Sequence, residues 1–165
     1  MKTQNKLLQI FSFIFLSSII IFSLRTLING TAFYADAKWY FEILQSVTFS
    51  HNLNLPGGLA NFQPPGVIAF WIYPYWLTKT LVDALQIQSS GFEVYFQLIV
   101  GLTNIFIFFA GLYITHFLVA QKFGSKIAIF STLTLFLSTN LLFYAAFEPI
   151  NSHLASFFIA SCFIY

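Results

Sequence analysis

Asp36 is the residue of this sequence from which we expect chemistry, because it places an acid beside a long apolar segment. The apolar run Leu7–Leu24 ends at Arg25, and Asp36 follows closely, together with Lys38 and Tyr40. A carboxylate beside a lipid surface is partly desolvated, which raises its basicity and suits a general base. The alternative interpretation is an acid favoured by the dipole at the N-terminus of a helix.

Two further polar segments contain candidate binding residues. The first, Asn61–Gly66, holds Gln63 before a rigid Pro-Pro turn, in which each proline fixes its own φ and keeps the preceding residue extended. The second, Glu148–His153, combines an acid and an imidazole at the end of another apolar run. Ionisable side chains in such places are candidates for function. Ordinary polarity at a membrane interface is the alternative for Glu148 and His153.

The sequence leaves a divalent metal open but indicates no ligand set. Carboxylates and imidazoles are common metal ligands, and Asp36, Glu148 and His153 are the candidates of those types. Their separation along the chain gives no recognisable metal-site spacing, so we assign no metal ligand. The single cysteine, Cys162, excludes an internal disulfide and a cysteine-based zinc site.

The composition requires a membrane as the solvent for most of the chain. Hydrophobic residues make up 58% of the 165 residues and charged residues only 7%, against about a quarter in soluble domains. A water-soluble core could not absorb so much apolar surface, which includes 23 phenylalanines. The net charge of +2, from scattered basic residues, is too small to indicate a nucleic-acid partner. We therefore expect an all-α integral membrane protein with membrane lipid as a partner.

Three segments are long and apolar enough to cross a bilayer, which takes about 17–25 residues of helix. They run over residues 7–28, 94–120 and 127–147. A fourth apolar segment, 154–165, reaches only about 18 Å as a helix, so a chain ending there would leave a carboxylate in hydrocarbon. We therefore expect a single membrane domain over residues 1–165, the N-terminal part of a longer polytopic helix bundle.

The basic residues near the span ends predict the orientation. The lysines before the first span place the N-terminus in the cytoplasm, at the plasma (inner) membrane, and residues 31–93 outside. The apolar part of 67–85 is short and contains Pro74, so we expect an interfacial or re-entrant helix there rather than a span. This arrangement keeps Lys122 and Lys126 in the cytoplasm with Lys2 and Lys6. The first span is too long for a cleaved signal peptide.

Within the outer loop, residues 33–47 carry the pattern of an amphipathic helix lying on the membrane. At 100° per residue, Lys38 and Glu42 point away from the apolar side. That apolar side consists of Phe33, Ala37, Tyr40, Phe41, Leu44 and Val47. Asp36 falls at the margin of the apolar stripe. It is expected to share the outer face with the Pro-Pro turn and the segment 148–153.

The order of these features resembles the polytopic GT-C glycosyltransferases, most closely the protein mannosyltransferase and lipid A aminoarabinose transferase group. The similar features are an N-terminal span, an Asp-aromatic loop (Asp36, Trp39, Tyr40) and the turn Gln63–Val67 leading into an apolar helix with Trp71. The resemblance covers the whole chain but only the amino-terminal part of such an enzyme. It implies inverting transfer of a sugar from a polyprenyl-phosphate-linked donor to an unknown acceptor on the non-cytoplasmic side.

In this resemblance Asp36 matches the aspartate of the first outer loop and is the expected catalytic base. The expected substrate-binding residues are Lys38, Tyr40, Gln63, Lys79, Glu148 and His153. The lipid-phosphate-linked sugar is the donor substrate, and no cofactor is assigned. This part of the enzyme is expected to be inactive alone. The competing interpretation is a non-catalytic membrane scaffold or transport subunit, or an inactive truncated remnant.

Overall fold

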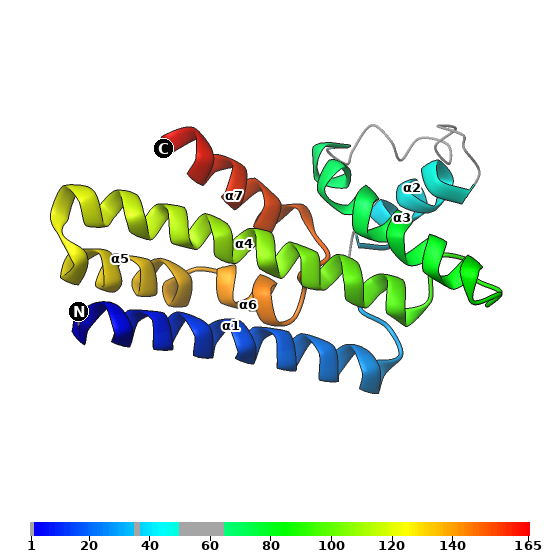
Figure 1. Cartoon of the computed structure of the whole chain (residues 1–165), viewed down its shortest axis with the longest axis horizontal. Coiled ribbons are helices and arrows are strands. Elements are labelled where there is room, and N and C mark those ends of the chain that lie inside the picture. The colour runs from blue at the N-terminus through cyan, green and yellow to red at the C-terminus, as the bar shows by residue number, and fades with distance from the viewer. Residues whose placement is uncertain (1, 35–36, 50–64) are drawn as a thin grey trace.

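The computed structural model describes residues 2–34, 37–49 and 65–165, which fold into helices joined by short connections (Figure 1). The elements are α1 (Lys2–Asn29), α2 (Ala37–Phe49), the 3₁₀ turn η2 (Pro65–Val67), α3 (Ile68–Ala84), α4 (Val94–Phe123), α5 (Ser125–Ser138), α6 (Leu141–Ala146) and α7 (Ser152–Ile164). Among these described residues, two helices are long and apolar enough to cross a membrane, over Gln9–Asn29 and Val94–Phe123. Both coincide with predicted spans.

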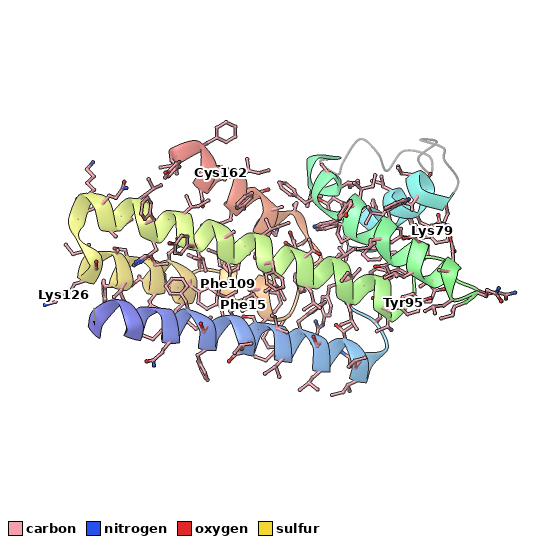
Figure 2. The ribbon with its side chains drawn as sticks, viewed as in Figure 1. Phe15, Lys79, Tyr95, Phe109, Lys126 and Cys162 are labelled. Carbon is pink, nitrogen blue, oxygen red and sulfur yellow. The ribbon has the colours of Figure 1, made fainter. Side chains whose placement is uncertain are left out.

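Helices α1 and α4 run antiparallel along the length of the molecule (Figure 1). Phe15 lies between them, with its ring 4.9 Å from that of Phe106 and 5.1 Å from that of Phe109 (Figure 2). Near the other end of the contact, a Cβ on Gly101 would lie only 2.2 Å from the Phe22 ring. Gly101 therefore lets a buried phenylalanine of α1 lie directly on the α4 backbone, as small residues do between membrane helices.

Helix α7 runs parallel to α4 and forms its most extensive contact. A Cβ on Gly111 would lie 2.9 Å from the Phe158 backbone, so the two helices approach at a glycine here as well. One turn further on, the hydroxyls of Thr115 and Ser161 share a hydrogen bond of 3.1 Å. Close packing and a hydroxyl pair are the two devices that hold apolar helices together where lipid removes the hydrophobic driving force.

The predicted span 127–147 is divided into two helices, α5 and α6, because the chain leaves helical geometry at Thr139 (φ −118°, ψ 172°). The hydroxyls of Ser138 and Thr139 bond carbonyls of the preceding turn, and Thr139 Oγ1 also accepts from Leu141 N at 3.3 Å. Ser and Thr compete in this way with the regular helix ladder. The run Ser138–Asn140 therefore breaks a segment whose apolar composition suggests one helix.

Helices α2 and α3 pack on each other and on the first turns of α4 (Figure 1). Four of the predicted apolar residues of α2 are buried: Ala37, Tyr40, Phe41 and Leu44. The rings of Tyr40 and Trp71 meet edge to face at 5.4 Å, and those of Phe41 and Tyr75 at 5.7 Å. The apolar face of α2 therefore contacts α3 instead of lying open to a membrane. Periodicity identified this face but could not identify its partner.

Helix α3 matches the predicted short helix at 67–85. It does not carry the chain to the opposite end of the bundle, because α1 ends where α4 begins. Two hydrogen bonds fix this junction: Gln97 Oε1, in the first turn of α4, accepts from Thr31 Oγ1 and Ala32 N. The whole segment between α1 and α4 thus starts and finishes at one end.

Candidate functional site at the polar end

The two ends of the bundle differ in charge. We call one the polar end: the region where α1 ends, α4 begins and α6 connects to α7, together with α2 and α3. Its described acids are Glu42, Asp83, Glu93 and Glu148, and its described basic residues are Arg25, Lys38 and Lys79.

The opposite, lysine end contains the start of α1 and the α4–α5 connection. Lys122 and Lys126 lie there, and the sequence of α1 begins with Lys2 and Lys6. Figure 2 shows Lys126 and Lys79 at opposite ends. Within the described residues, the carboxylates of the chain all belong to the polar end.

Gln97 organises the entry to the predicted catalytic loop. It is 2% exposed, and its side-chain oxygen accepts from Ala32 N at 2.6 Å and Thr31 Oγ1 at 3.1 Å. Its side-chain nitrogen donates to Phe92 O at 2.6 Å. One buried amide therefore joins the segment that follows α1 to the segment that precedes α4. It fixes the chain four residues before Asp36.

Asn104 fixes the second predicted polar segment. Its side chain is fully buried, and its Nδ2 donates to Pro149 O at 2.6 Å and to Asn151 O at 2.9 Å. The Asn151 side chain in turn accepts from His153 N at 2.9 Å and caps α7. The α6–α7 connection is therefore attached to α4, about three turns after its start, by the carboxamide of Asn104.

Arg25 links the end of α1 to the end of α6. Its guanidinium donates to Phe147 O and lies 4.4 Å from the centroid of the Tyr34 ring. A cation bonded to the last carbonyls of a helix is stabilised by the helix dipole. Arg25 thus holds Phe147, and with it the neighbouring Glu148, beside the C-terminal end of α1.

The predicted site residues have different outcomes. Asp36 and Gln63 lie outside the described residues. Lys38 is exposed on the first turn of α2. Tyr40 is 1% exposed, with its ring packed against Trp71, so the ring is a core contact between α2 and α3.

Lys79 is engaged in an ion pair with Asp83 and lies 4.8 Å from the centroid of the Phe49 ring. This pair is the only one within 4.0 Å in the part of the chain that the structure describes. The i,i+4 spacing on one helix explains it. The positive charge of Lys79 is therefore already compensated locally.

Glu148 and His153 both lie at the polar end but do not form an ion pair with each other. Glu148 is half-buried beside Phe147. His153 is exposed, with its ring stacked on Tyr144 at a centroid distance of 4.3 Å. Across the described ranges, no group of three His, Cys, Asp or Glu side chains is close enough to hold a metal ion.

Glu93 closes the turn that leads into α4. Its carboxylate accepts from Ser90 N at 2.6 Å, Ser90 Oγ at 2.9 Å and Gly91 N at 3.0 Å. Partial burial alone would raise the pKa of Glu93, but these hydrogen bonds to the charged form outweigh it and hold the pKa below its ordinary value. Opposite the same turn, burial raises the pKa of the Tyr75 phenol, which donates to Gly91 O at 3.0 Å.

No protein-family model matches the chain, and neither a curated protein nor a solved structure matches it. The interpretation of the polar end as a candidate site therefore depends on its geometry alone. Neither Gln97 nor Asn104 was among the site residues predicted from the sequence. The available signal was their spacing: two amides seven residues apart lie on one face of a helix.

Proposed function

We propose that this chain is the N-terminal part of an integral membrane glycosyltransferase, which transfers a sugar from a polyprenyl-phosphate-linked donor on the non-cytoplasmic side. The observation that carries the proposal is the gathering of both candidate segments at one end of the bundle. Gln97 holds residues 31 and 32, which lead to Asp36, and Asn104 holds the connection that contains Glu148. The similarity of feature order to the GT-C enzymes supplies the reaction.

In the proposed reaction, the carboxylate of Asp36 accepts the proton of the acceptor hydroxyl. The hydroxyl oxygen then forms a bond to the anomeric carbon while the bond from that carbon to the phosphate oxygen breaks. The polyprenyl phosphate leaves as an anion, and the anomeric configuration inverts. A cation near the departing oxygen stabilises the developing charge.

Lys38 is the best candidate for that cation. It is exposed on the first turn of α2 and is two residues from Asp36 in the sequence. Lys79 is paired with Asp83, and Arg25 is bonded to Phe147 O. Glu148 and His153 are then available for contacts to the sugar or the acceptor from the α6–α7 side.

The decisive experiment replaces Asp36 by Asn in the full-length protein and measures transfer from a polyprenyl-phosphate sugar in membranes. We expect transfer to be lost while insertion and expression stay unchanged. Asp83→Asn is the matched control, because it removes an acid of the same end that only pairs with Lys79. Transfer by the Asp36 variant at the original rate would remove this residue from the base role.

Orientation is tested by single cysteines at three exposed positions, Gln88, Ser125 and His153, with Cys162 replaced by Ser. An impermeant maleimide should label positions 88 and 153 from outside intact cells, and position 125 only after permeabilisation. Outside labelling at 125 would reverse the orientation and exclude a reaction on the non-cytoplasmic side. A scaffold would give the expected labelling without transfer by the full-length protein.

A further inference from the structure

The bundle has a wide apolar surface with no partner in this chain. Helices α1, α4 and α5 expose large apolar side chains between the two charged ends. The set includes Phe13, Leu16, Ile20, Phe106, Tyr113 and Phe130. Apolar area on three neighbouring helices around one bundle requires a continuous apolar cover. Hydrocarbon of a lipid bilayer is such a cover.

The distance between the charged ends matches the thickness of that cover. Asn104 and Lys122 are eighteen residues apart on α4, which is about 27 Å of helix, against about 30 Å for the hydrocarbon core of a bilayer. On α1, Lys6 and Arg25 are nineteen residues apart, which corresponds to about 28 Å. The two lengths agree, although Lys6 and Arg25 lie nearer the polar end than Lys122 and Asn104, respectively, because Phe15 packs on Phe106 and Phe109 and Phe22 packs on Gly101.

The irregular backbone lies at the same boundary. The break between α5 and α6 follows one turn after Phe136, whose ring stacks on that of Phe108 at 5.9 Å. The α6–α7 connection is bonded to Asn104. Irregular backbone exposed to lipid is not tolerated inside the hydrocarbon. Both interruptions lie near the level of Asn104. The hydrocarbon therefore cannot extend far beyond Asn104 toward the polar end.

We propose that the hydrocarbon core of the bilayer covers the bundle from the level of Lys122 to the level of Asn104, and that α4 projects beyond it. In the projecting part, Val94 and Asn104 are ten residues apart, or about 15 Å, and this part carries α2 and α3. The Gln97 junction stands seven residues, or about 10 Å, outside the hydrocarbon. That is at the outer side of the phospholipid headgroups, which extend about 5–8 Å beyond the hydrocarbon on each side.

We call this position of the bundle in the bilayer its register. The register deepens the proposed function, and its chemical consequence rests on that function. A lipid-linked donor keeps its isoprenoid chain in the hydrocarbon and holds its phosphate at headgroup depth. The chain segment leading to Asp36 leaves the Gln97 junction at the outer side of the headgroups. The phosphate and the attached sugar would then reach the loop without leaving the membrane surface.

The test measures depth by spin labels on the whole chain in phosphatidylcholine vesicles, in a Cys162→Ser background, with oxygen and a water-soluble nickel chelate as relaxation agents. A label at Tyr113 should be the deepest, because it lies midway between Asn104 and Lys122 on α4. A label at Leu16 should also lie in the hydrocarbon but nearer the polar end, because the neighbouring Phe15 packs on Phe106 and Phe109. A label at Ile28, twelve residues along α1 from Leu16, should shift outward by about 18 Å. A label at Leu85, beyond α3, should contact the chelate freely.

The register is overturned if the Leu85 label is as deep as the Leu16 label, if Ile28 and Leu16 report the same depth, or if the chelate reaches Tyr113. These readouts need no transfer activity and should be the same in the Asp36→Asn variant. If the labels contradict the register but transfer still depends on Asp36, the proposed reaction stands and takes place at another depth. If the labels report the expected depths but transfer does not depend on Asp36, the register stands and the proposed chemistry is excluded.

Discussion

The polar end and the lysine end of this bundle are held together by different interactions. At the polar end, the buried amides of Gln97 and Asn104 bond backbone groups of distant segments. At the lysine end, the chain reverses at Gly124 (φ +85°), where backbone bonds join Gly124 N to Ala120 O and Ala128 N to Gly124 O. A simple reversal of helix direction needs only local backbone hydrogen bonds, as at the lysine end. The hydrogen bonds of the buried amides fix loops in defined positions, which a binding or catalytic site requires.

The largest effect should come from Asn104→Leu, which removes two hydrogen bonds and leaves Pro149 O and Asn151 O without their donor. We expect a loss of about 2–3 kcal/mol in the free energy of unfolding, since an unsatisfied buried acceptor costs about 1–3 kcal/mol. Reversible unfolding in mixed micelles measures it. Asn140→Leu is the control, because Asn140 is exposed and its side chain makes no cap bond to α6. Equal losses in both variants would contradict an anchoring role of Asn104.

Gln97→Leu removes three hydrogen bonds but should have a smaller and more local effect, of about 1–2 kcal/mol. Because Thr31 is exposed and Phe92 is half-buried, only the Ala32 amide loses its partner in a buried place. The measurement is hydrogen exchange of the Ala32 amide, which should lose protection. In Gln88→Leu, an exposed amide of the α3–α4 connection, protection of Ala32 should be unchanged. Unchanged exchange in the Gln97 variant would show that the junction is held by other contacts.

At the lysine end, Gly124→Ala should cost about 1–2 kcal/mol, because an L-residue with a side chain is strained at this positive φ. No heavy atom lies within 4 Å of the Cβ position, so strain is the only expected penalty. Unfolding of the variant in micelles gives the value. Gly66→Ala, which also meets open space but lacks a positive φ, is the control. A loss larger than that of Asn104→Leu would reverse the comparison between the ends.

The turn before α4 should respond to acid. Hydrogen bonds hold the pKa of Glu93 below its ordinary value of 4.5, so its contribution to stability is complete above that pH. The contribution is lost as the pH falls through the lower pKa of the folded state. Protection of the Gly91 amide against hydrogen exchange should decrease over this acidic range. In Glu93→Gln the protection should be lower at neutral pH and should no longer change with acid.

The smallest effect is expected for Lys79→Met. Lys79 and Asp83 form a surface i,i+4 pair, for which about 0.3–0.5 kcal/mol is typical. Micelle unfolding of Lys79→Met, Asp83→Asn and the double variant isolates the coupling between them. A coupling above the effect of Gln97→Leu would mean that ion pairing, and not the buried amides, dominates the polar end.

The sequence allowed the helical class and the positions of α1, α3 and α4 to be predicted, because long apolar runs and Pro74 are local signals. The division of 127–147 escaped prediction, because composition averages over Ser138 and Thr139, whose hydroxyls act on single carbonyls. The burial of Tyr40 against Trp71 also escaped, since periodicity shows that a face is apolar but not what covers it.

The candidate site was predicted less completely. From the sequence, Arg25 only marked the end of the first apolar run, and its bond to Phe147 O depends on a contact 122 residues away in the sequence. Gln97 carries no motif, and its importance comes from the backbone groups that meet it. Asp36 and Gln63 stay predictions, because they lie outside the described residues.

Helix phase sets a restriction on the sequence of α4. Gln97, Asn104 and Gly111 follow one another at intervals of seven residues, so they lie along one line of the helix surface. They receive, in turn, the segment after α1, the α6–α7 connection and the backbone of α7. One inserted residue between Gln97 and Asn104 would rotate the first contact about 100° from the others and move it about 1.5 Å. A one-residue insertion in this part of α4 would therefore disrupt the alignment of the three contacts.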